Sequence, residues 1–119
     1  MQSHCIVLDE PTAMLDPVGR REVMETIRQL NAEGITVIII THFMEEAVQA
    51  NRVVVVNQGE VKMDGAPRSV FSHVDELKAM GLDVPVAAEI AARLRGKGID
   101  LPGDIITKEE LGEALCRLS

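Results

Sequence analysis

Two adjacent carboxylates, Asp9 and Glu10, close a short apolar run at residues 5–9. A carboxylate at the carboxyl end of a strand can hold Mg²⁺ through its waters, and a neighbouring carboxylate can accept a proton from a water that attacks a phosphoryl group. The alternative interpretation is the solvated end of a strand, which is the commoner meaning of an acidic pair taken alone. Asp9 is therefore a candidate metal ligand, and Glu10 is a candidate general base.

A histidine, His42, stands just after a second apolar run at residues 35–40. If the two runs are neighbouring parallel strands, their carboxyl ends meet at one edge of the sheet, where α/β proteins bind ligands. A histidine at that edge can donate a hydrogen bond to a phosphate oxygen whose negative charge grows in the transition state. Taken alone, His42 is an ordinary loop histidine, so its role depends on how the two strands pair.

The segment between the two runs predicts a helix. Asp16 is a typical N-cap, Pro17 suits the first helical position, and Gly34 suits the C-terminal end. Residues 5–40 therefore predict a strand–helix–strand unit with a helical crossover, as in a parallel α/β sheet. The uninterrupted apolar character of residues 5–9 predicts a first strand that is buried on both faces.

The pattern changes after residue 42. The sequence predicts a short helix over residues 43–50, a third buried strand over 52–57 and a hairpin through Gln58-Gly59 to a strand over 60–64. Thr107 and Glu110 have the spacing of a capping box for the last helix. We place a soft boundary at residue 73, between an α/β part (1–73) and a helical tail (74–119). The other predicted helices cover residues 68–72, 74–80, 85–95 and 108–118.

Composition excludes several classes of function. The net charge is −7 and aromatic residues make up 2% of the chain, which opposes binding to nucleic acid. Residues 1–50 carry eight acidic and three basic side chains, so the negative charge gathers around the candidate site. The apolar runs are far shorter than the ~20 residues of a membrane helix.

These motifs together resemble a known family. Residues 6–17, Ile-Val-Leu-Asp-Glu-Pro-Thr-Ala-Met-Leu-Asp-Pro, resemble the Walker B segment and D-loop of an ATP-binding-cassette (ABC) ATPase, and Thr41-His42 resembles its H-loop. The hairpin and the Gly-Ala-Pro step at 65–67 favour the transporter branch over ATPases of DNA repair or chromosome organisation. The D-loop sequence and the helical tail are most similar to those of the ATPase subunits of energy-coupling-factor importers, which take up cobalt, nickel or vitamins.

The resemblance implies a fold and a set of roles. The fold would be α/β, part of the parallel sheet of a P-loop NTPase with flanking helices, a β-hairpin and a small C-terminal helical tail. Asp9 would bind the Mg²⁺ of Mg-ATP, and Glu10 would be the general base. Asp16, in the D-loop, would contact the nucleotide site of the opposing subunit, and His42 would contact the γ-phosphate.

The same resemblance implies cofactors, partners and a location. The cofactors would be ATP and Mg²⁺. The partners would be a second ATPase subunit, identical or different, and transmembrane transporter subunits, with no nucleic acid. The location would be the cytoplasmic face of the cell membrane, and the tail is a candidate region for pairing the two ATPase subunits.

Three motifs that the resemblance leads us to expect are missing. No lysine of the sequence follows the glycines of a G-x-x-x-x-G-K-[ST] loop, which holds phosphates, and the glutamine-containing Q-loop and the serine-glycine-glycine signature are also absent. The chain therefore resembles the C-terminal half of such an ATPase, and it is expected to be inactive alone. The alternative function is a non-catalytic module that acts only in subunit association. Residues 35–40 are expected to leave an apolar strand edge unpaired, which predicts self-association.

Overall fold

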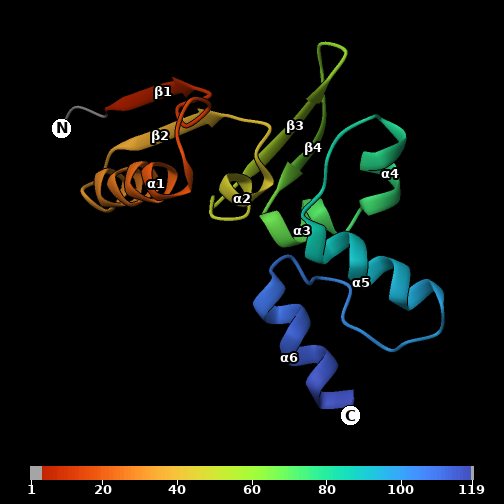
Figure 1. Cartoon of the computed structure of the whole chain (residues 1–119). Coiled ribbons are helices and arrows are strands. Elements are labelled where there is room, and N and C mark those ends of the chain that lie inside the picture. Colours follow the sequence, from red (N-terminus) through yellow and green to blue (C-terminus); the bar gives the residue numbers. More distant parts are fainter. Residues whose placement is uncertain (1–3, 119) are drawn as a thin grey trace. The chain divides into compact units, whose positions relative to one another are not determined.

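The computed structural model describes residues 4–118 and contains four strands and six helices within that range. Their order along the chain is shown in Figure 1. The chain divides between Phe43 and Met44 into two compact units. The elements are β1 (Cys5–Asp9), α1 (Pro17–Ala32), β2 (Thr36–Ile40), α2 (Met44–Ala47), β3 (Val53–Asn57), β4 (Glu60–Gly65), α3 (Pro67–Phe71), α4 (Val74–Ala79), α5 (Val86–Gly96) and α6 (Lys108–Leu118).

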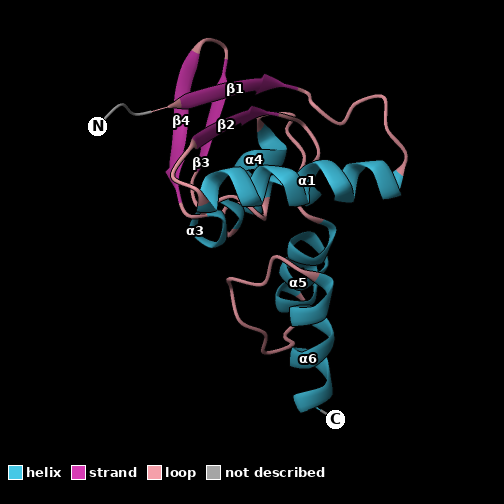
Figure 2. Ribbon diagram, turned by 90° about the vertical axis from the view of Figure 1, so that its left-hand side faces the viewer, coloured by secondary structure: helices cyan, strands magenta, loops and turns pink. Residues whose placement is uncertain are grey.

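The first unit is the predicted strand–helix–strand motif. β1 and β2 pair in parallel, with Cys5 opposite Thr36 and Asp9 opposite Ile40. Figure 2 shows α1 running alongside the two strands. Asp16 Oδ1 accepts a hydrogen bond of 2.7 Å from the Gly19 N–H, and Pro17 begins the helix. Gly34 follows the helix end with a left-handed φ of +96°, so the predicted cap residues at both ends are confirmed.

The prediction that the first strand is buried on both faces is wrong. Side chains alternate between half-buried and exposed along both β1 and β2. Val7 is 60% exposed, and Ile38 and Ile40 are 47% and 53% exposed. The reason is that one helix can cover only one face of a two-stranded sheet. Among the described residues, β2 pairs with no strand other than β1, so its other edge is also unpaired.

The second unit begins with a helix that is shorter than predicted. α2 ends at Ala47, and the N–H groups of Gln49 and Ala50 then bond to carbonyls three residues back, at Glu46 and Ala47. Such bonds form tighter turns than an α-helix, which accounts for the early end.

The predicted hairpin is confirmed. β3 and β4 pair antiparallel, and Gln58 and Gly59 both have positive φ, as a two-residue hairpin turn requires. Arg52 joins the strands through Nε and Nη2, which lie 2.7 and 2.5 Å from the Asp64 carboxylate oxygens. The valine run is not a fully buried strand, however, because Val54 and Val56 are exposed.

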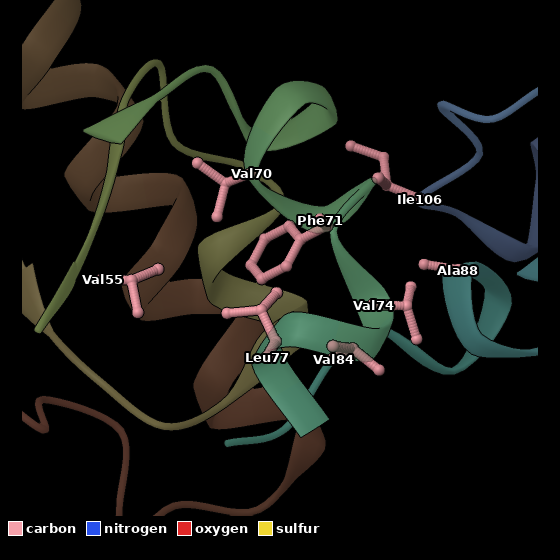
Figure 3. Close-up of a cluster of buried hydrophobic side chains, with 8 residues drawn as sticks. All are labelled: Val55, Val70, Phe71, Val74, Leu77, Val84, Ala88 and Ile106. Carbon is pink, nitrogen blue, oxygen red and sulfur yellow. The ribbon is translucent and has the colours of Figure 1, made fainter. Parts of the chain in front are cut away.

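The core of the second unit joins the hairpin to the helices that follow it. Figure 3 shows Phe71 and Leu77 at the centre of this cluster of buried side chains. Phe71 and Val74 lie on either side of the predicted boundary at residue 73, yet they share this core. The division into 1–73 and 74–119 concerns the family's organisation and stays a prediction. The cluster consists of Val55, Val70, Phe71, Val74, Leu77, Val84, Ala88 and Ile106.

The last helix is held by the predicted capping box. Glu110 Oε1 accepts the Thr107 N–H at 3.1 Å, and Thr107 Oγ1 accepts the Glu110 N–H at 3.2 Å. Arg68, on α3, forms an ion pair with the same carboxylate, which ties α6 to the rest of the unit. Within residues 4–118, no helix combines the length and apolar character needed to cross a membrane.

Candidate functional site

The carboxyl edge of the β1–β2 pair brings together two of the predicted site residues. Because Asp9 stands opposite Ile40, Glu10 and the Thr41-His42 pair both emerge at this edge. His42 Nδ1 lies 2.7 Å from Glu10 Oε1. An ionised carboxylate can only accept hydrogen bonds, so Nδ1 is the donor when Glu10 is charged. The sequence indicated a shared edge, and the structure adds a direct contact between the candidate base and the histidine.

Glu10 has an unusual backbone. Its N–H still donates to the Ile40 carbonyl at 2.7 Å, which extends the parallel ladder by one bond. Its φ is +48°, in the left-handed region that few residues other than glycine adopt. The chain therefore turns sharply out of β1 at the residue whose side chain contacts His42. Such strain at a charged residue is typical of functional sites.

Both members of this pair are open to solvent. The side chains of His42 and Glu10 are 64% and 45% exposed. An exposed pair of this kind contributes little to the stability of the fold, typically about 0–1 kcal/mol. Exposure also leaves room for a water molecule beside the Glu10 carboxylate. The geometry can therefore place a proton acceptor, oriented by an imidazole, next to solvent.

Asp9 is available as a ligand but does not form a metal cage. It is exposed, and its carboxylate forms no hydrogen bond or ion pair with the other described residues. The described part of the chain contains no group of three or more side chains that could hold a metal ion. Mg²⁺ commonly binds through one or two carboxylates, several waters and substrate phosphates. One exposed carboxylate at the end of β1 is compatible with binding of this kind, but it is too few ligands for a site made of protein side chains alone.

Asp16 has a structural role in this chain. Its carboxylate caps α1, and the loop that precedes it exposes Met14 at 96% and Leu15 at 38%. Exposed apolar side chains in a loop are available for contact with another surface. The predicted contact of Asp16 with the site of an opposing subunit stays a prediction.

Two residues near the edge were missed by the sequence analysis. The Arg20 guanidinium lies over the Phe43 ring, with its carbon 4.0 Å from the ring centroid. The Phe43 ring in turn lies 4.5 Å from the His42 ring, centroid to centroid, at an angle of 33°. The available signals were weak: Phe43 is one of only two aromatic residues, and Arg20 stands one turn into a helix.

The described residues at this edge include no lysine. All four lysines of the sequence, Lys62, Lys78, Lys97 and Lys108, belong to the second unit. A hollow of about 660 Å³ lies among residues of α4 and α5, but it is open to solvent and includes none of the predicted site residues. The described residues at this edge are carboxylates and a histidine, and no lysine lies beside them.

Comparison with known proteins gives close relatives. No family model matches the sequence. The energy-coupling factor transporter ATP-binding protein EcfA1 of Caldanaerobacter subterraneus is 61% identical over 118 residues, which are 98% of this chain and 43% of that protein. The proteins of the same name from Symbiobacterium thermophilum and Clostridium perfringens are 56% and 52% identical over 119 residues. The chain spans about two-fifths of the length of these relatives.

A solved structure is also similar to this chain. It is described as cbiO1 from Clostridium perfringens, part of the ABC transporter complex cbiONQ. It is 36% identical, superposes with a TM-score of 0.53, and covers 63% of this chain and 31% of its own.

Proposed function

We propose that this chain belongs to the ABC ATPases, in their energy-coupling-factor branch, and that it supplies the hydrolytic edge of the ATP-hydrolysing subunit of an importer. The 2.7 Å contact between His42 and Glu10 at the carboxyl edge of a parallel strand pair carries the proposal. That contact places a base, an orienting imidazole and solvent at one point. A positioned proton acceptor next to solvent is what the attack of water on a phosphoanhydride uses.

Each site residue has one role in this proposal. Bound Mg-ATP supplies the γ-phosphoryl group that is attacked and the positive charge that stabilises it. Glu10 takes a proton from the attacking water onto a carboxylate oxygen. His42 donates Nδ1–H to that carboxylate, and with a proton on both ring nitrogens it would also donate Nε2–H to a phosphate oxygen. Asp9 would hold the Mg²⁺ that neutralises phosphate charge, and Asp16, the N-cap of α1, would act at the facing nucleotide site.

The wider assignment follows the relatives. The coupled process is uptake of a metal ion or a vitamin, driven from the cytoplasmic face of the cell membrane. The partners are a second ATPase subunit and transmembrane subunits, and residues 74–119 help to pair the ATPase subunits. Support comes from the names of the relatives, which are transporter ATP-binding proteins, and from the solved neighbour, which is part of a transporter complex. The exposed Leu115 and Leu118 on α6 are available for such pairing.

A chimeric subunit tests the proposal. In it, the matching 118 residues of the Caldanaerobacter relative are replaced by this chain, and ATP hydrolysis is measured in the assembled transporter. Glu10→Gln keeps the size of the side chain but cannot accept the proton, so turnover should fall about 10²–10⁴-fold while ATP still binds. The matched control is Glu22→Gln, an exposed glutamate on α1, which should leave turnover unchanged.

Two results would contradict this assignment. Near-normal turnover in Glu10→Gln would remove Glu10 as the base. A chimera that assembles but does not hydrolyse ATP with Glu10 in place would favour the alternative function, a module for subunit association only.

A further inference from the structure

His42 needs support that its contact with Glu10 does not provide. Its side chain is 64% exposed, and a single hydrogen bond at an exposed site holds an imidazole weakly because water competes for both partners. The His42 ring also contacts the Phe43 ring, with 4.5 Å between the two centroids. A tilted arrangement at this distance is favourable for aromatic pairs, and it restricts the plane in which the imidazole can lie.

Phe43 is itself held in place from two sides. Its backbone N–H donates to Thr41 Oγ1 at 2.9 Å, which fixes the three-residue loop that carries His42. On its ring lies the Arg20 guanidinium, 4.0 Å from the centroid. This cation–π contact connects the first turn of α1 to the loop after β2.

The guanidinium of Arg20 contacts the Phe43 ring and leaves one of its own donors without a partner within residues 4–118. Arg20 Nε is buried and has no hydrogen-bond partner among the described residues. A buried donor without a partner is costly, and at this position the flat stacking of the guanidinium on the Phe43 ring is the contact that offsets the cost. Arg21, the next residue, is exposed and makes no such contact.

We propose that Arg20 and Phe43 are positioning residues that hold His42 against Glu10 through the stack Arg20–Phe43–His42. This inference rests on the proposed function, because it assigns the purpose of the stack to hydrolysis. It also joins the helix that follows the Asp16 loop to the catalytic edge. The competing explanation is ordinary packing of the loop against α1, with no consequence for Glu10.

The chimeric subunit described above separates the two explanations. Arg20→Gln and Phe43→Leu should each lower kcat about 10-fold and change the KM for ATP less than about 2-fold, because misplaced catalytic groups slow the chemical step more than they weaken binding. Phe43→Tyr keeps the ring and should retain turnover. The matched control Arg21→Gln removes an equal charge one residue away and should behave like the parent.

The decisive measurement is made in the absence of His42. If the stack acts through the imidazole, then Phe43→Leu should cause no further loss of turnover in a His42→Ala background. An equal, additive loss in that background would overturn the inference. Parent turnover in His42→Ala alone would instead overturn the role of His42 in the proposed function.

A second readout does not depend on activity. In this chain, proton NMR should show a nuclear Overhauser effect between the His42 ring and the side-chain protons of Glu10. Arg20→Gln should weaken this effect at least about 2-fold, because the two side chains would then be in contact in only part of the molecules. Arg21→Gln should leave it unchanged. Equal signals in both variants, with the fold intact, would overturn the inference.

Discussion

Removing the Glu110 side chain should loosen the start of α6 by a predictable amount. Glu110 Oε1 accepts the N–H groups of Ile106 and Thr107, both at 3.1 Å, and the other carboxylate oxygen pairs with Arg68. Ile106 belongs to the core of the second unit, so its N–H has poor access to water when the acceptor is lost. Glu110→Ala therefore removes two hydrogen bonds and one ion pair, while the helix sequence around it is unchanged.

The magnitude follows from these contacts. Loss of the acceptor of one amide costs about 1 kcal/mol, and the second amide adds a similar or smaller amount. The Arg68 pair is half exposed on the arginine side and adds less than about 1 kcal/mol. The sum is about 2 kcal/mol, which corresponds to about a 30-fold change in a local opening equilibrium. Glu110→Gln keeps an acceptor oxygen and should cost less than half as much.

Amide hydrogen exchange measures this directly. Exchange of the Ile106 and Thr107 amides should speed up about 30-fold in Glu110→Ala. The matched control is Glu109→Ala, the neighbouring exposed glutamate in the same helical turn, which should change exchange only slightly. Equal exchange in the two variants would refute the assignment of the capping contacts.

The pH dependence has a definite sign. Burial would raise the pKa of Glu110, but the Ile106 N–H, together with Arg68 and Thr107, outweighs it and holds the pKa below its ordinary value. A lowered pKa in the folded chain means that the charged form is the stabilising one. Protection of the two amides should therefore be complete above the ordinary glutamate pKa of about 4.3 and should be lost as pH falls through the lower folded value. Glu110→Gln should abolish this dependence.

The remaining predictions concern the chain by itself. Purified alone, it should show negligible ATP hydrolysis and only weak nucleotide affinity, because no lysine or glycine-rich loop neutralises the phosphates; turnover above background that Glu10→Gln abolishes would show otherwise. It should also self-associate as concentration rises, because Val7, Ile38 and Ile40 expose an apolar face beside an unpaired strand edge. Light scattering that finds a monomer over a wide concentration range would end this expectation.

Local rules predicted much of the fold. The caps at Asp16 and Gly34, the Gln58-Gly59 turn and the Thr107–Glu110 capping box each depend on residues a few positions apart. Their energies are decided within a turn or two of chain, so sequence is enough to identify them. The shared edge of Glu10 and His42 also followed from sequence, because a helical crossover between two parallel strands brings their carboxyl ends together.

Other features needed the tertiary structure. An apolar run shows that a strand can be buried, but it does not show whether anything covers each face, so Val7 was wrongly expected to be inside. The left-handed turn at Glu10 and its 2.7 Å contact with His42 depend on how two loops leave the sheet.

The contact between Arg20 and Phe43 could not be predicted from the sequence. It joins a helix to a loop that is distant in sequence, and it depends on the side-chain rotamers of both residues. No periodicity or spacing encodes that choice. Sequence thus determined which residues could do the chemistry, whereas packing alone decided which neighbours hold His42 in place, because orientation depends on contacts made only after the chain has folded.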